Sequence, residues 1–330
     1  MRAAVEAVLP FWLDRPDEEA VQIAQAAGQA GLTGLWIGEM ATFDAFALAT
    51  AIGTSAPGLR LNVGPLPISV RTPAAIALGA SSVAALTGCA IDVALGASSP
   101  AIVTGWHDRD WLHGAARMRE TIECLRPILH GERADYEGHY VRSHGFRLRK
   151  PLPHTRIGIG AFGPAMIRLA AEIADEVVLN LSTPNRVADV RRQIDGLAVA
   201  AGREPPHVTV WVPAALRPGN ASVRQAANQL AIYLGPPGYG EMFIDLGFAE
   251  LVERARSGVR RTELAAAIPL ELVQQLCAFG TADQIASRLQ AYLDAGADTV
   301  AVVPVTAEDP DGRGVLSCAG EVFHHAPRRA

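Results

Sequence analysis

Short apolar runs alternate with amphipathic stretches along most of the chain. Eight runs rich in Val, Ile, Leu and Ala are apolar on successive residues rather than on every second residue. Runs of this kind predict strands that are buried on both faces, as in a parallel sheet. We expect strands at residues 3–10, 33–39, 59–67, 89–96, 156–163, 176–182, 207–216 and 298–305.

The segments between these runs are typical of helices. Met118, Ile122, Leu125 and Leu129 form one apolar stripe, and Thr281 with Gln284 predicts a capping box. The expected helices cover residues 17–31, 43–56, 72–88, 115–131, 165–175, 185–202 and 282–297.

Two segments interrupt the alternation. Residues 132–154 lose the helical period and predict a small excursion with a hairpin, which follows the fourth helix. Residues 222–279 show only helical patterns with Gly and Pro breaks, which predicts a helical insertion after the seventh strand.

Eight strands that alternate with helices predict a (β/α)8 barrel, with residues 1–330 forming a single domain. The competing fold is a doubly wound open sheet. That fold favours a glycine-rich first turn, whereas the turn after the first strand here reads "PFWLDRP".

Composition narrows the choice of partners. The 330 residues are 49% hydrophobic and carry a net charge of −5, which argues against a nucleic-acid or membrane-surface role because both need a basic face. The N-terminus lacks a secretory pattern and no apolar run is long enough to span a membrane, so we expect a cytoplasmic protein. The four cysteines are scattered in apolar contexts, which favours buried free thiols over disulfides or metal ligands.

In a barrel of this kind, chemistry takes place on the loops that follow the strands. These loops hold no Ser-His-Asp arrangement, no paired histidines and no lysine, so metal ligation and covalent catalysis are not expected. Loops that are poor in reactive groups but contain glycines indicate a bound organic cofactor. Gly160 to Gly163 opens directly onto a helix and is the best candidate to hold a phosphate; close strand–helix packing is the alternative.

Several segments resemble the luciferase-like family of flavin and deazaflavin enzymes, on the branch that uses coenzyme F-420. They include "GLTGLWIGEM", "LRLNVGPLPISVRTPAAIALGASSVAALTG", "VALGASSPAIVTGWH" and "GIGAFGPAMIRLAAEIADEVVLNLSTP", in family order. The resemblance implies a (β/α)8 barrel with an insertion after the seventh strand. It also implies hydride transfer between C5 of a tricyclic cofactor, bound at the strand ends, and a small-molecule substrate. A related branch consists of monooxygenases that use FMN, and homodimers are common in the family.

The family carries a cis peptide bond in a bulge of the third strand, which supports one face of the cofactor ring. The aligned bond here is Gly64-Pro65, and a proline at this position makes the cis form much less costly. We therefore expect a cis bond; a trans proline that ends the strand is the alternative.

The chain departs from the family at two sites. Glu39-Met40 replaces an Asp-His pair that serves in proton transfer, and Ser98-Ser99-Pro100 replaces a segment with an acid/base glutamate. Oxidation of a sugar alcohol needs such a base, so reduction of an activated C=N or C=C bond is the better hypothesis. Its proton would come from Glu39, His107 or water. A solvated Glu39 and a surface His107 that caps the next helix are the structural alternatives.

Three sets of residues are candidates for the site. Trp12, Met40, Trp106 and Trp111 would wall the substrate pocket, unless the tryptophans serve packing alone, and Arg217 is a weaker candidate for an anionic cofactor tail. The catalytic candidates are Glu39 and His107. The expected cofactor contacts are Glu39, Asn62, Gly64, Pro65, Gly96, Ala97, Ser98, Ser99, Ala161, Phe162, Gly163, Asn180 and Thr183.

Three functions follow from these observations. The first is a coenzyme F-420-dependent oxidoreductase, and the second is an FMN-dependent monooxygenase. The third is a non-catalytic ligand-binding barrel, because the histidine and the glutamate are missing.

Overall fold

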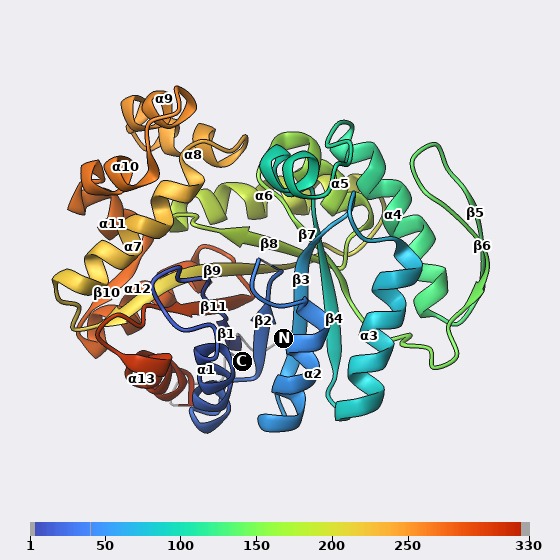
Figure 1. Cartoon of the computed structure of the whole chain (residues 1–330), viewed down its shortest axis with the longest axis horizontal. Coiled ribbons are helices and arrows are strands. Elements are labelled where there is room, and N and C mark those ends of the chain that lie inside the picture. Colours follow the sequence, from blue (N-terminus) through green and yellow to red (C-terminus); the bar gives the residue numbers. More distant parts are fainter. Residues whose placement is uncertain (1–3, 40, 325–330) are drawn as a thin grey trace.

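A computed structural model describes residues 4–39 and 41–324. Eight parallel strands close into a barrel in the order β1-β2-β3-β4-β7-β8-β9-β11, with β11 paired to β1 (Figure 1). Each lies within a predicted range, so the predicted barrel is confirmed. The strands are β1 (Ala4–Val8), β2 (Gly34–Ile37), β3 (Arg60–Pro67), β4 (Ile91–Gly96), β7 (Ile157–Gly160), β8 (Glu176–Asn180), β9 (His207–Leu216) and β11 (Thr299–Pro304).

Helices surround the barrel and bury the outer face of its strands (Figure 1). The predicted helices are all present. The hydrophobic pattern did not predict α13, which packs beside α1 after a turn rich in Asp, Gly and Pro. The surrounding helices are α1 (Glu19–Gln29), α2 (Ala45–Ser55), α3 (Pro73–Thr87), α4 (Gly114–Leu129), α5 (Pro164–Ile173), α6 (Pro184–Ala200), α12 (Ala282–Asp294) and α13 (Arg313–His324).

Local sequence explains where several helices begin and end. Thr72 accepts a hydrogen bond from the backbone N–H of Ala75 at the start of α3, and Gly88 ends that helix in the left-handed conformation. Thr281 and Gln284 form the predicted capping box of α12. Within residues 4–39 and 41–324, no helix has both the length and the hydropathy that crossing a bilayer requires.

The insertion forms a small helical unit on one side of the barrel (Figure 1). It has its own core, which includes Leu234, Phe243 and Leu272. The predicted range also contains most of a short strand that the sequence did not indicate, β10 (Ala278–Gly280), which pairs with β9. The helices of the insertion are α7 (Asn220–Tyr233), α8 (Tyr239–Asp245), α9 (Ala249–Arg256), α10 (Arg261–Ala267) and α11 (Leu270–Leu276).

The excursion after α4 contains the predicted hairpin. Strands β5 (Arg133–Glu137) and β6 (Arg142–Arg147) pair in antiparallel fashion. The carboxylate of Glu120 on α4 accepts hydrogen bonds from the backbone N–H groups of His139, Tyr140 and Val141. These bonds fix the hairpin turn to the outside of the barrel.

The barrel interior is packed rather than hollow. Trp36 and Trp211 meet edge to face with ring centroids 5.5 Å apart. Val8, Val178 and Val303 fill the space around them. The site must therefore lie above this layer, where the strands end and the loops begin.

Candidate active site

The third strand carries the predicted bulge. The register of β3 against β4 shifts between Val63 and Leu66, and the Gly64-Pro65 bond is cis, which confirms the prediction. Gly64 has φ +131, and a Cβ at this position would collide with the carbonyl oxygen of Ala94. Only glycine fits both the conformation and the space.

Pro65 lies against two other predicted residues at the barrel mouth. A Cβ added to Gly96 would lie 3.0 Å from Cβ of Pro65, and one added to Gly160 would lie 3.4 Å from its Cγ. The two glycines thus leave room for the proline ring at the ends of β4 and β7. The contact at Gly160 is an ordinary one and comes from a strand, so both the phosphate and the packing interpretations of this glycine stay open, and neither strand end places a side chain over Pro65.

The turn after β7 lies beneath the insertion. The Phe162 ring packs against Tyr239 with centroids 4.1 Å apart, and the Phe162 carbonyl accepts a hydrogen bond from Arg186 Nη2 at 3.0 Å. Asn180 donates from Nδ2 to the Tyr239 hydroxyl oxygen at 3.0 Å. Burial raises the pKa of Tyr239 and of neighbouring Tyr233 above the usual value, so both hydroxyls stay protonated at neutral pH.

Gly163 is the open end of this turn. It precedes Pro164 at the start of α5, no side chain caps that helix, and a Cβ added to Gly163 would meet no atom within 4 Å. Ala161 beside it is buried. An uncapped helix start with free space in front of it can accept an anion.

Thr183 and Arg217 lie near the mouth but have local roles. The Thr183 hydroxyl accepts a hydrogen bond from the backbone N–H of Arg186 and so caps α6. Arg217 is exposed, with φ +50, and its backbone N–H donates to the Gly280 carbonyl. Their predicted contacts with a cofactor stay predictions.

Glu39 follows β2 and is held in an ion pair. Arg71 donates from Nε to Glu39 Oε2 at 2.8 Å, and its Nη2 contacts both Glu39 and Asp44. The hydrogen bonds that Arg71 donates to the two carboxylates, to Glu39 first, raise the pKa of Arg71 above its usual value. Glu39 is thus an anchored carboxylate at the mouth rather than a freely solvated one. Met40, the next residue, lies outside the described residues.

The loop after β4 holds several predicted residues. Ala97 and Ser99 are partly buried, while Ser98 adopts φ +59 and accepts a hydrogen bond from Trp111 Nε1 at 3.1 Å. A short π-helix, η1 (Ala101–Trp106), follows.

His107 ends η1 and is exposed. The next helix, α4, begins at Gly114 and is preceded by His113, so His107 does not cap it. An exposed imidazole can exchange protons with water, which keeps His107 a candidate proton donor.

A cavity of about 520 Å³ lies beside the mouth, beneath the insertion. Its walls include Trp12, Phe43 and Trp106, together with Leu264 from α10. Trp12 is buried and donates from Nε1 to the Pro304 carbonyl at 2.8 Å, so it serves both packing and the wall. Trp111 is not part of this wall.

Asn62 lies deeper, inside the barrel. It is fully buried, and its Nδ2 donates to Glu6 Oε2 at 2.9 Å, as does Trp36 Nε1 at 2.7 Å. The structure therefore places Asn62 among buried polar groups on the same strand as Gly64 and Pro65, and its predicted contact with a cofactor stays a prediction.

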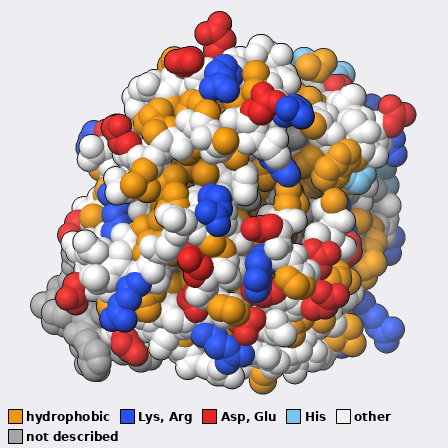
Figure 2. All heavy atoms as spheres, turned by 60° about the vertical axis from the view of Figure 1, so that its left-hand side comes forward, with side chains coloured by type: hydrophobic (Ala, Val, Ile, Leu, Met, Phe, Trp, Pro, Cys, Tyr) orange, Lys and Arg blue, Asp and Glu red, His pale blue; other side chains and the backbone are white. Residues whose placement is uncertain are grey.

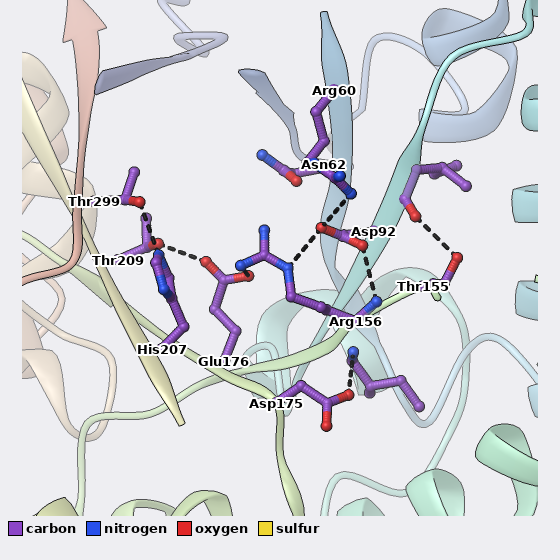
Figure 3. Close-up of polar contacts among 12 residues, drawn as sticks. Arg60, Asn62, Asp92, Thr155, Arg156, Asp175, Glu176, His207, Thr209 and Thr299 are labelled. Atoms are coloured by element: carbon purple, nitrogen blue, oxygen red, sulfur yellow. Dashed lines mark hydrogen bonds and ion pairs between the residues drawn. The ribbon is translucent and has the colours of Figure 1, made fainter. Parts of the chain in front are cut away.

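Those polar groups belong to an ionic network at the N-terminal end of the barrel strands, which we call the closed end. The sequence analysis did not identify this network. The Arg156 side chain lies between the carboxylates of Asp92 and Glu176, 2.8 Å from Asp92 Oδ2 and 3.6 Å from Glu176 Oε2 (Figure 3). Thr209 donates to Glu176 at 2.5 Å. Burial raises the pKa of Glu176 to about 8. The sequence did carry a signal for this network, because the apolar runs that predicted the strands contain charged residues.

No metal site is evident. Within the described ranges, no group of three or more His, Cys, Asp or Glu side chains could hold a metal ion. The four cysteines are buried free thiols, as predicted.

Comparisons with known proteins agree with this architecture. The family model described as luciferase-like monooxygenase matches residues 12–299. A Mycobacterium tuberculosis protein whose name assigns it provisionally to the coenzyme F-420-dependent oxidoreductases is 26% identical, over 91% of this chain and 94% of that protein.

Solved structures of two kinds share the fold. The F-420-dependent tetrahydromethanopterin reductase from Methanopyrus kandleri has a TM-score of 0.82 at 18% identity, covering 97% of this chain and 98% of that one. A Baeyer–Villiger monooxygenase from Pseudomonas putida in complex with FMN has a TM-score of 0.70 at 16% identity, with 97% of each chain covered. With the family model matching most of its length, this chain belongs to the luciferase-like monooxygenase family.

Proposed function

We propose that this chain is a coenzyme F-420-dependent oxidoreductase that reduces an activated C=N or C=C bond of a small organic molecule. The observation that carries the proposal is the floor of the barrel mouth. There Pro65 of the β3 bulge lies between Gly96 and Gly160, which project no side chain over it. A flat ring system fits such a floor, and the open turn at Gly163 fits a phosphate.

Bound there, the cofactor would supply a hydride at its C5. Pro65 would support one face of the ring, and the uncapped start of α5 at Gly163 would hold the phosphate. Phe162 and Asn180 are fixed by contacts with Tyr239, so the turn beside the ring is held by the insertion.

The available acids and bases favour reduction. Directly after β4 the chain reads Ser98-Ser99-Pro100, so the positions nearest the strand end offer no carboxylate to remove an alcohol proton, and Asp108 and Asp110 further along the loop are exposed. Reduction needs only a proton donor. Glu39, anchored by Arg71, and the exposed His107 are the candidates.

An FMN-dependent monooxygenase is the second candidate, supported by solved monooxygenases with the same fold, one of them holding FMN. A non-catalytic binding barrel is the third.

Fluorescence titrations with oxidised coenzyme F-420 and with FMN separate the first two. We expect micromolar binding of coenzyme F-420 and at least about tenfold weaker binding of FMN; tight binding of FMN alone contradicts the proposal. Binding of coenzyme F-420 with no substrate-dependent change of its visible absorbance, across an imine and enone panel, favours the third.

We also propose that the protein forms a homodimer through α2 and α3. Neither helix contains a charged residue, and Leu78 and Leu86 on α3 are 55% and 70% exposed. Light scattering should give the mass of a dimer for the wild type and of a monomer for Leu78→Glu. Val199→Glu, at a position on α6 that is 72% exposed, is the control. A monomeric wild type contradicts this proposal.

A further inference from the structure

The cavity beneath the insertion has mainly apolar walls. Trp12 comes from the loop after β1, Phe43 from the loop after β2, and Trp106 from the end of η1. Val259 and Leu264 close it from the insertion. Figure 2 shows hydrophobic side chains gathered in patches on the face turned toward the viewer, which is the left-hand side of Figure 1. Its volume of about 520 Å³ is typical of sites for small organic molecules.

The charged groups of the cavity largely cancel one another. Arg15 donates to both carboxylate oxygens of Glu19, from Nε to Oε2 at 3.0 Å and from Nη2 to Oε1 at 2.6 Å. The remaining charged side chains in the wall, Asp17 and Arg261, are exposed and of opposite sign. A phosphate or carboxylate entering the cavity would lose water and meet Arg261 as its one cation outside the Arg15–Glu19 pair, and that arginine is exposed to solvent, where its attraction is weak.

One wall of the cavity continues into the barrel mouth. Trp12 packs in the same cluster as Trp36 of the barrel interior and bonds to Pro304 at the end of β11. Ala41, another wall residue, lies two positions after Glu39, and Trp106 immediately precedes His107. The two proton-donor candidates are therefore next to the cavity along the chain.

We infer that this cavity is the substrate pocket and that the substrate is an uncharged, predominantly apolar molecule. The inference rests on the proposed function, because it assigns the ligand as the hydride acceptor. Sugar phosphates and other anionic substrates would place their charge against a mainly apolar wall, so we expect them to bind more weakly than an uncharged molecule.

Two fluorescent probes with the same aromatic skeleton test the inference. N-phenyl-1-naphthylamine is uncharged, and 1-anilinonaphthalene-8-sulfonate adds one negative charge. We expect one equivalent of the neutral probe to bind, with the anion at least about tenfold weaker. Ala41→Trp and Thr42→Trp, both exposed wall positions, should each weaken the neutral probe at least about fivefold. Ala200→Trp, exposed on α6 and outside the wall, should not change it.

The outcomes separate the pocket from the proposed function. Equal or tighter binding of the anionic probe overturns the uncharged substrate class. Unchanged binding of the neutral probe to both wall variants, with native circular dichroism spectra, overturns the assignment of the pocket. Titration of the same samples with coenzyme F-420 reports on the proposed function. If coenzyme F-420 binds while the probes fail, only the pocket is wrong; if the probes behave as expected but coenzyme F-420 does not bind, the hydride-acceptor role is wrong.

Discussion

The two ends of the barrel use charged residues in different ways. At the closed end, Asp92 and Glu176 are buried on either side of Arg156 (Figure 3), and Glu6 is buried beside them and accepts hydrogen bonds from Trp36 and Asn62. At the mouth, the predicted site is built mainly from glycines, a proline and aromatic rings, with Glu39 paired to Arg71.

This contrast shows that a shifted pKa does not by itself locate the active site. Burial raises the pKa of Glu176 and of Glu6, and such shifts often mark functional groups. Both residues lie among side chains that satisfy one another at the N-terminal end of the strands, the end associated with stability. The mouth has the shape for chemistry but few titratable groups, consistent with a cofactor that supplies the reaction.

The largest effect should come from breaking the network at the closed end. Arg156→Met removes the guanidinium between the buried side chains of Asp92 and Glu176 and leaves Asp92 with the partly exposed Arg60 alone, which should cost roughly 3 kcal/mol of unfolding free energy, the lower end of the range for a broken buried pair. Urea unfolding measures this cost. Arg192→Met, which removes an exposed pair with Asp189, should cost under about 1 kcal/mol. Similar losses in the two variants would contradict the stabilising role of the network at the closed end.

The pH dependence of stability should report on Glu176. Its pKa is raised to about 8 in the folded protein, so the folded state holds a proton that the unfolded chain releases near its ordinary value. The stability from this protonated form is present at acidic pH and is lost as the pH rises toward 8. Relative to Glu176→Gln, the wild type should therefore lose stability between pH 5 and about 8, by at most about 1.4 kcal/mol per pH unit. Parallel curves for the two proteins would show that Glu176 is already ionised at neutral pH.

The fold was predictable from the sequence because each barrel strand lies in a run of mainly apolar residues. The runs at 89–96 and 298–305 contain β4 and β11, whose residues are all buried. The pattern missed β10 because it has only three residues, and it missed α13 because that helix is rich in small residues; the positions of both depend on packing against β9 and α1.

The site was predictable only in part. The resemblance indicated the bulge, and the Gly64-Pro65 bond is cis as expected. The position of Asn62 could not be inferred, because a residue inside a strand faces either the barrel interior or the helices. The contacts of Tyr239 with Phe162 and Asn180 were also missed, since the insertion reaches the mouth through tertiary packing that no local pattern records.

A charge introduced at the mouth should change the affinity for the cofactor rather than the free energy of unfolding. Gly163→Asp places a carboxylate at the uncapped start of α5, where it can cap the helix but repels an anion. Its affinity for coenzyme F-420 should fall at least about tenfold, while the free energy of unfolding stays within about 1 kcal/mol. Gly196→Asp, at a position in α6 with equal space around it, is the matched control. Equal affinities of the two variants in a fluorescence titration would place the phosphate elsewhere.

The smallest change in stability should come from a substitution at Glu39. This substitution tests most directly whether charged residues at the mouth differ in role from those at the closed end. Glu39→Gln weakens a half-buried pair with Arg71, which still contacts Asp44, so it should cost under about 1 kcal/mol in urea unfolding. If Glu39 supplies the proton, single-turnover oxidation of reduced coenzyme F-420 by an enone should slow at least about tenfold. His107→Asn should then change the rate little, because exposed His107 would not be needed. The reverse pattern assigns the proton to His107, and unchanged rates in both variants assign it to water. A large loss of stability in Glu39→Gln would instead make Glu39 the equivalent of Glu176, a carboxylate that holds the fold together, and would break the distinction between the two ends of the barrel.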